Sequence, residues 1–92
     1  MRFSMQEQEA GVLELTELSD VRDLVLFNDD VNTFDHVIST LVRVCRHTPE
    51  QAEQCATIVH YRGKCTVKNG TLDELRPMRD AICEAGIDAR IL

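Results

Sequence analysis

The chain has 92 residues, and its 16 Asp and Glu against 10 Lys and Arg give a formal charge of −6. This length fits one domain with a single small core and excludes a large multi-domain enzyme. The net negative charge disfavours nucleic acid as a partner, because binding to phosphates depends on clustered Lys and Arg. No apolar run reaches the ~18–20 residues of a membrane span, and the N-terminus carries no apolar block typical of a secretory leader.

The first predicted element after the N-terminal segment is a strand. Residues 1–21 are rich in Glu, Gln and Ser, so we expect a flexible N-terminal extension followed by one domain over residues 22–92. The apolar run 24–27 is typical of a strand that is buried on both faces. The polar segment 28–30 then favours a turn, because Asn and Asp side chains bond nearby backbone N–H groups.

Two helices are predicted next from their apolar spacing and their start signals. The first spans about 33–46 and begins at a cap formed by Asn32 or Thr33. The second follows Thr48, which starts a capping box with Pro at the first helical position. It ends at Gly63, a residue type that commonly terminates helices.

The C-terminal part is predicted to alternate between strand and helix. We expect a short strand over 64–67, a turn at 69–70, and a third helix within 71–86 that begins with a second capping box. Pro77 should kink this helix or delay its start. The alternating pattern of 87–91 predicts a half-buried final strand.

The predicted order is therefore β-α-α-β-α-β. Three strands and three helices pack most economically as an α+β fold, with a small three-stranded antiparallel sheet packed against the helices.

Four cysteines stand at positions 45, 55, 65 and 83 and form no C-x-x-C pair. Small domains with many disulfides are secreted, so we expect reduced thiols in a cytoplasmic protein. Structural zinc sites use four ligands at tighter local spacing, and we expect no metal and no cofactor. One alternative hypothesis is a thiol or zinc module that uses Cys45, His47, Cys55 and Cys65.

Two groups of polar residues have the chemistry to bind a cation. Asn28, Asp29 and Asp30 crowd the end of the predicted buried strand and offer oxygen acceptors and negative charge, which suit an ammonium group. His60 lies one helical turn beyond Ala56, and its neutral imidazole could accept one more hydrogen bond. Each group also has a purely structural interpretation, as a turn or as a histidine near a helix end. Because no phosphate-binding glycine loop is present, the motifs favour a binding module over an enzyme.

Two segments of the chain resemble the ClpS adaptor family. They are 24–34, with its Asn-Asp-Asp turn, and 52–64, with the pattern V-H-x-x-G-K. The resemblance implies an adaptor that binds proteins with destabilising N-terminal residues (N-degrons; Phe, Leu, Trp or Tyr). It would deliver them to a ClpA- or ClpC-type AAA+ unfoldase of the Clp protease, without enzymatic activity. The extension before residue 22 would take part in this delivery, and we expect a monomer.

The resemblance also implies functions for particular residues. Asn28 and His60 would hold the free α-amino group of the substrate. Asp30 would supply charge, and Asp29 would contact the peptide backbone. The first side chain would enter a hydrophobic pocket lined by Leu26, Asn32, Phe34, Val37, Ala56, Val59 and, from the last strand, Ile87. Lys64 and Asp73 are the expected contacts to the unfoldase.

The chain departs from the family pattern at two pocket positions. Many members carry Met where this chain has Phe34, and many carry Met where it has Ala56. We expect a reshaped pocket in which Phe34 fills part of the space that Ala56 leaves, and acceptance of Ile or Val depends on that balance. The alternative function is a protein-interaction domain of the same fold, similar to a ribosomal stalk domain, without N-degron recognition.

Overall fold

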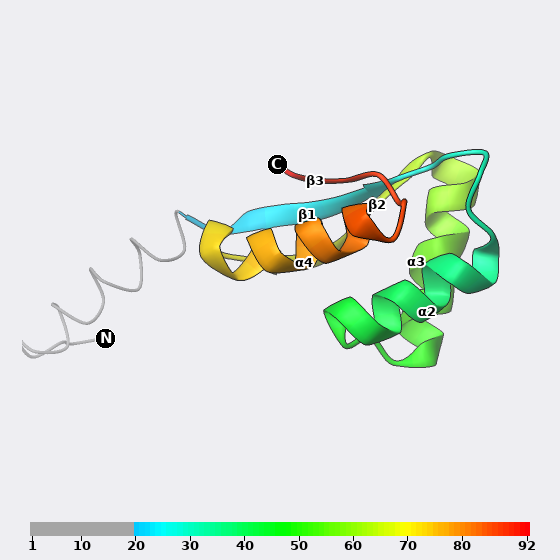
Figure 1. Cartoon of the computed structure of the whole chain (residues 1–92), viewed down its shortest axis with the longest axis horizontal. Helices are drawn as coiled ribbons and strands as arrows, with labels where there is room; N and C mark the ends of the chain where they lie inside the picture. Colours follow the sequence, from blue (N-terminus) through cyan, green and yellow to red (C-terminus); the bar gives the residue numbers. More distant parts are fainter. Residues whose placement is uncertain (1–19) are drawn as a thin grey trace, which may run out of the picture.

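The structure of the chain is a computed structural model, and it describes residues 20–92 (Figure 1). The elements in chain order are β1 (Arg22–Phe27), α2 (Phe34–Cys45), α3 (Pro49–Arg62), β2 (Lys64–Gly70), α4 (Leu72–Glu84) and β3 (Ala89–Ile91). The predicted order and the α+β class are confirmed. The predicted N-terminal extension lies almost entirely outside the described residues, so its flexibility stays a prediction.

The sheet is antiparallel throughout and has the strand order β2-β1-β3. Strand β1 is central and carries the apolar run that predicted it, with Leu24, Val25 and Leu26 all buried. The strand starts at Arg22, two residues earlier than the apolar run suggests. In an edge strand, the backbone groups on one side of these residues would have no partner strand. In the central strand, backbone groups are paired on both sides.

Strand β2 corrects one prediction. The expected turn at Asn69 and Gly70 is wrong, because both residues continue the strand and pair with Asp23 and Arg22, respectively. The Asn69 amide also donates a hydrogen bond to the Asp23 carboxylate. The extra length of β1 supplies the partner that keeps these residues extended, and this pairing overrides the turn preference of the Asn-Gly pair. The chain instead turns at Thr71, directly into the next helix.

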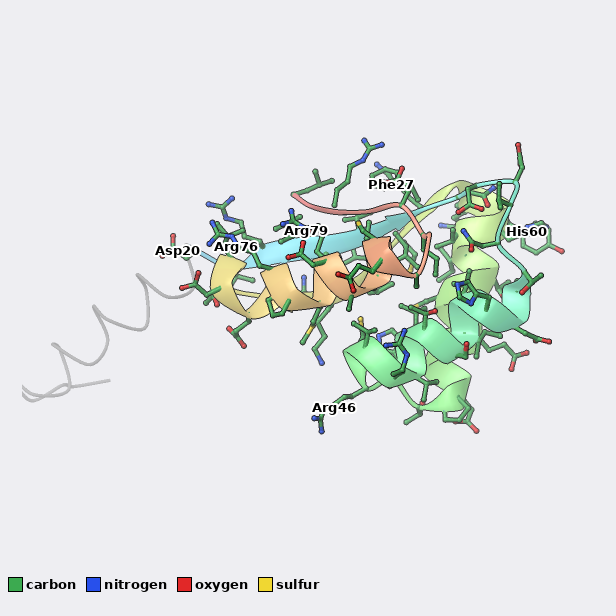
Figure 2. The ribbon with its side chains drawn as sticks, viewed as in Figure 1. Asp20, Phe27, Arg46, His60, Arg76 and Arg79 are labelled. Atoms are coloured by element: carbon green, nitrogen blue, oxygen red, sulfur yellow. The ribbon has the colours of Figure 1, made fainter. Side chains whose placement is uncertain are left out.

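Helices α2 and α3 begin and end as predicted. Thr33 caps α2 by accepting a hydrogen bond from the backbone of His36 at 3.1 Å. The helix is capped at its C-terminus by Arg46, which adopts the left-handed conformation with φ of 57°. Figure 2 labels Arg46 at this end of α2. Thr48 forms a complete capping box with Gln51 at the start of α3. These caps satisfy backbone donors that a helix start otherwise leaves without partners.

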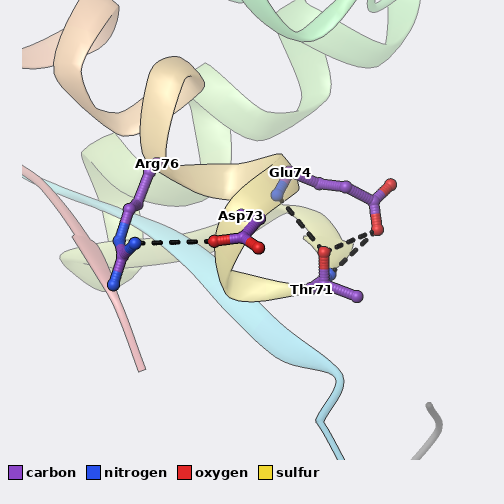
Figure 3. A network of polar contacts seen from close by, with 4 residues as sticks. All are labelled: Thr71, Asp73, Glu74 and Arg76. Atoms are coloured by element: carbon purple, nitrogen blue, oxygen red, sulfur yellow. Dashed lines mark hydrogen bonds and ion pairs between the residues drawn. The ribbon is translucent and has the colours of Figure 1, made fainter.

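Helix α4 begins at Leu72 and continues through Pro77, so a delayed start is wrong. Thr71 and Glu74 form the predicted capping box, with the Glu74 backbone N–H donating to Thr71 Oγ1 at 3.2 Å (Figure 3). Pro77 removes only the hydrogen bond to the carbonyl of Asp73, which lies in the exposed first turn. The capping box therefore fixes the start of the helix, and the proline is tolerated close to it.

The last strand starts at Ala89, so the prediction that it includes Ile87 is wrong. The chain reverses after α4 at Gly86, which has φ of +86°, a conformation that favours glycine. Ile87 follows this reversal, donates its N–H to the carbonyl of Ile82 at 3.2 Å, and is buried. Its side chain is therefore held inside the fold without belonging to the sheet.

Helix α4 lies along the sheet, whereas α2 and α3 form a hairpin beyond the end of β1 (Figure 1). The largest fully buried side chains come from both regions and are Leu24, Leu26, Thr40, Leu41, Cys45, Leu75 and Ile82. Among the described helices, none is both long and apolar enough to cross a membrane.

Candidate functional site

A cavity of about 210 Å³ opens where β1 ends, between the β1–α2 loop, helices α2 and α3, and the segment before β3. Its lining consists of Leu26, Phe27, Asn28, Asp29, Asn32, Phe34, Val37, Ala56, Val59, His60 and Ile87. All seven residues expected to form a hydrophobic pocket are present. Three of the four residues expected to bind the amine and the backbone line the same cavity. The structure thus brings together residues from four separate parts of the chain.

Three of the expected site residues lie elsewhere. Asp30 is exposed in the β1–α2 loop and does not line the cavity. Lys64 and Asp73, the expected unfoldase contacts, are both exposed. Lys64 is the first residue of β2, whereas Asp73 lies in the first turn of α4, which begins just after the other end of that strand. At about 3.3 Å per residue, β2 spans roughly 20 Å between these two regions. The structure does not bring these two residues together.

The β1–α2 loop is shaped by the carboxylate of Asp29. Its Oδ1 accepts hydrogen bonds from the backbone N–H groups of Val31, at 2.9 Å, and Asn32, at 2.7 Å. Its Oδ2 accepts a third bond from Asn32 Nδ2 at 2.7 Å. The bond from the Asn32 backbone is the main cause that holds the pKa of Asp29 below its usual value of 3.8. Asp29 is therefore ionised at neutral pH and organises the loop around the cavity.

Two further hydrogen bonds tie this part of the chain to the end of α4. Asn32 Nδ2 donates to the carbonyl of Gly86 at 2.8 Å. His36 Nε2 donates to the carbonyl of Ala85, also at 2.8 Å. Both acceptors immediately precede Ile87, so these bonds hold its side chain in the cavity wall.

Helix α3 supplies the opposite wall and the imidazole of His60. Ala56 and Val59 are buried and point their small side chains to the cavity, whereas His60 is exposed. Figure 2 shows His60 near the end of α3, beside the loop that follows β1. The Phe34 ring meets the His60 ring edge-to-face at a centroid distance of 6.3 Å. Because Phe34 is 40% exposed, these two rings form the rim of the cavity.

The amide of Asn28 and the imidazole of His60 make no hydrogen bond within residues 20–92. The backbone N–H of Asn28 donates to the carbonyl of Gly63 at 2.8 Å, which fixes the loop against the end of α3. The two side chains thus line one cavity from two anchored elements. Their polar atoms remain available to a ligand.

Sequence reasoning missed Phe27, which also lines the cavity. The backbone N–H of Phe27 donates to the carbonyl of Asp88 at 2.9 Å, and the guanidinium of Arg90 lies 4.5 Å from the ring centroid. Arg90 is in turn paired with the Asp88 carboxylate at 3.1 Å. One feature of the sequence could have identified Phe27. It directly precedes the Asn-Asp-Asp segment and is therefore at the same end of β1 as those residues.

The four cysteines are unpaired, and no three metal-binding side chains come together in residues 20–92. The zinc alternative therefore has no ligand set in this part of the chain. Burial raises the pKa of Cys45 to about 11, and burial followed by the nearby Cys55 raises that of Cys65 to about 11. Neither thiol is ionised at neutral pH, which makes both poor nucleophiles.

Comparisons with solved structures support this fold. The structure of Agrobacterium tumefaciens ClpS2 bound to L-phenylalaninamide superposes with a TM-score of 0.69. The superposition covers 79% of this chain and 95% of that one, at 20% sequence identity. At this identity the likeness concerns the fold alone.

Sequence comparisons give relatives of two kinds. The human E3 ubiquitin-protein ligase UBR2 is 40% identical over 58 residues, and UBR1 of Drosophila melanogaster is 31% identical over 58 residues. Each match spans 63% of this chain but only 3% of the ligase, so the likeness concerns one small part of a much larger protein. The ATP-dependent Clp protease adapter protein ClpS of Thermosynechococcus vestitus is 29% identical over 65 residues, 70% of this chain and 69% of that protein.

The family model of the ATP-dependent Clp protease adaptor protein ClpS matches residues 19–88, about three quarters of the chain. The match includes β1, the β1–α2 loop, both helices of the hairpin and the segment with Ile87. The chain therefore belongs to the ClpS family of Clp protease adaptor proteins.

Proposed function

We propose that this protein recognises the N-terminal residue of substrate proteins and delivers those substrates to a Clp AAA+ unfoldase. The observation that carries the proposal is the cavity itself. It combines an apolar interior with two polar side chains, Asn28 and His60, that have no partners within residues 20–92. A free N-terminal residue with a bulky apolar side chain has the matching pair of groups, an ammonium beside a hydrophobic side chain.

The charge around the cavity suits an ammonium group. Asp29 is kept ionised by its three hydrogen bonds, and Asp30 adds a second carboxylate to the same loop. We propose that Asn28 and His60 accept hydrogen bonds from the α-amino group. In this arrangement Asp30 adds negative charge from outside the cavity, and Asp29 positions the loop and faces the peptide backbone.

The expected affinity follows from these groups. Burial of a Phe or Leu side chain contributes roughly 1.5–3 kcal/mol, and each charge-assisted hydrogen bond contributes roughly 1.5–3 kcal/mol. Association costs offset part of this gain, which leaves about −8 kcal/mol, or binding in the micromolar range. An acetylated N-terminus lacks the charge and should bind much more weakly.

The solved structure of a ClpS2 protein supports the proposed recognition of an α-amino group together with an apolar side chain. The solved structure of Agrobacterium tumefaciens ClpS2 is bound to L-phenylalaninamide, a small molecule with a free α-amine and a benzyl side chain. Our cavity offers polar groups for the first and apolar walls for the second. We propose that N-terminal Phe, Leu, Trp and Tyr are the ligands of this cavity.

The delivery step is proposed from family membership. The partner would be the N-terminal domain of a ClpA- or ClpC-type unfoldase, contacted near the exposed Lys64 or Asp73. Because Lys64 begins β2 and Asp73 lies in the first turn of α4, each should be tested separately. We further propose that the protein acts in the cytoplasm as a monomer, uses no cofactor and catalyses no reaction.

The test is fluorescence-polarisation binding of a labelled peptide that begins with a free Phe. We expect micromolar or tighter binding, which is lost when the peptide is acetylated or begins with Ser. Asn28→Ala and His60→Ala should each weaken binding at least tenfold. Gln54→Ala is the matched control, because Gln54 is an exposed amide on the same helix as His60 and does not line the cavity.

A chain that folds but binds no free N-terminal Phe, Leu, Trp or Tyr would overturn the proposal. That result would favour the alternative, a protein-interaction domain of the same fold without N-degron recognition.

A further inference from the structure

The orientation of the Asn32 amide is fixed by its neighbours. One side of this amide lies 2.7 Å from Asp29 Oδ2 and 2.8 Å from the carbonyl oxygen of Gly86. An ionised carboxylate and a carbonyl accept hydrogen bonds but cannot donate them, so the group that faces both must be the NH₂. Both amide hydrogens are therefore used, and the oxygen Oδ1 points away from these partners.

Asn32 Oδ1 has no hydrogen-bond donor within residues 20–92. It lies next to residue 86, because the nearest neighbour of a Cβ placed on Gly86 would be this oxygen, at 3.9 Å. Since residue 86 has no side chain, nothing at that position covers the oxygen. Asn32 itself lines the cavity and is partly buried.

The remaining polar side chains of the cavity lining are already assigned. Asp29 uses both carboxylate oxygens within the loop, and the proposed function assigns Asn28 and His60 to the α-amino group. The other lining side chains are apolar. Asn32 Oδ1 is therefore the one side-chain acceptor in this lining that neither the fold nor the bound amine would use.

We propose that Asn32 Oδ1 accepts a hydrogen bond from the first side chain of the substrate, so that the cavity prefers N-terminal Tyr or Trp to side chains without a donor. This inference rests on the proposed function. A purely apolar cavity would disfavour a phenol or an indole N–H, because burying either donor without a partner is costly. An acceptor in the wall reverses that preference, and one such bond corresponds to an affinity gain of about 3- to 10-fold.

The test uses peptides that differ only in the donor of their first residue. One pair begins with Tyr or Phe, and the other begins with Trp or with benzothienylalanine, in which sulfur replaces the indole N–H. We expect at least one donor-bearing peptide to bind wild-type protein about 3- to 10-fold more tightly than its partner. The ratio of the two dissociation constants within a pair can be compared between wild type and variant even where the absolute affinities differ.

The matching variant is Asn32→Leu, which removes the acceptor and keeps a side chain of similar size. Loss of the two bonds to Asp29 and Gly86 should weaken every peptide, but only the loss of Oδ1 abolishes the preference within a pair. Val37→Ala is the control, because it alters an apolar wall residue and should weaken both members of a pair equally.

Equal binding within both pairs by wild-type protein would overturn the inference. A preference that survives in folded Asn32→Leu protein would also overturn it, because the donor would then be bound elsewhere. If no peptide binds in an amine-dependent way, the proposed function fails as well. Amine-dependent binding of Phe without any preference refutes the assignment of Asn32 alone.

Discussion

Replacement of Asp29 by Ala should destabilise the β1–α2 loop and weaken peptide binding, even without direct contact between Asp29 and the ligand. The substitution removes the acceptor for three hydrogen bonds of 2.7–2.9 Å. Water can replace the bond to the exposed Val31, whereas the two donors of Asn32 are partly buried. Shielded bonds to a charged acceptor contribute roughly 1.5–3 kcal/mol each, and partial exposure reduces this. We expect a total loss of about 1–2 kcal/mol in the free energy of unfolding.

Urea unfolding followed by circular dichroism measures this loss. With a slope of about 1 kcal/mol/M, the midpoint should fall by roughly 1 M or more. Asp30→Ala is the matched control, because Asp30 stands in the same loop, is exposed, and accepts no hydrogen bond within residues 20–92. Equal losses for the two variants would refute the argument that the hydrogen bonds of Asp29, rather than the loop's charge, hold the structure.

The same carboxylate predicts a pH dependence. Folding lowers the pKa of Asp29 below 3.8, so the folded state favours the ionised form. Its contribution is therefore fully present above pH ~4 and is lost as the pH falls through the lowered pKa. The difference in unfolding free energy between wild type and Asp29→Asn should shrink over that range. A difference that stays constant down to pH ~2 would contradict this assignment.

Three further predictions concern other positions. Iodoacetamide at neutral pH should modify the exposed Cys83 first and Cys45 only after unfolding, because burial raises the Cys45 pKa to about 11; early Cys45 adducts in mass spectra would contradict this. Gly86→Ala should cost about 1–2 kcal/mol of unfolding free energy, since Gly86 has φ of +86°. Gly70→Ala, at a position without positive φ, is its control, and equal losses would show that backbone conformation is not the cause. Ala56→Met should weaken binding of an Ile-leading peptide in polarisation titrations, and unchanged affinity would remove Ala56 as a determinant of specificity.

Local signals predicted most element boundaries correctly. The capping boxes at Thr48 and Thr71 involve residues three positions apart, so sequence alone contains all the information that they need. The Asn-Gly pair at 69–70 misled because strand pairing is not local. Those residues stay extended only because β1 starts early enough to pair with them, and no pattern near them contains that fact.

Only part of the cavity could be predicted from the sequence. Resemblance to a family, rather than spacing or periodicity, indicated the lining residues. The hydrogen bond from Asn32 to Gly86 joins residues 54 positions apart, and that from His36 to Ala85 joins residues 49 positions apart. Neither bond could be derived from periodicity. The turn at 28–30 was predicted from side chains that bond nearby backbone N–H groups, and Asp29 accepts such bonds from Val31 and Asn32. Its third bond, from the side chain of Asn32, was not predicted because it depends on the folded shape of the loop.

The placement of the cavity explains why binding and stability should be linked in this protein. Its walls come from separate segments that meet in the hydrophobic core, and the hydrogen bonds of Asn32 and His36 additionally join the β1–α2 region to the end of α4. A peptide that contacts the β1–α2 loop, α3 and Ile87 together would hold these segments against one another. Any ligand that binds only the folded state adds RT ln(1 + [L]/Kd) to its stability, or about 2.7 kcal/mol at one hundred times Kd. Variants that loosen the end of α4 should therefore lose affinity and stability together, and the ligand should restore the stability.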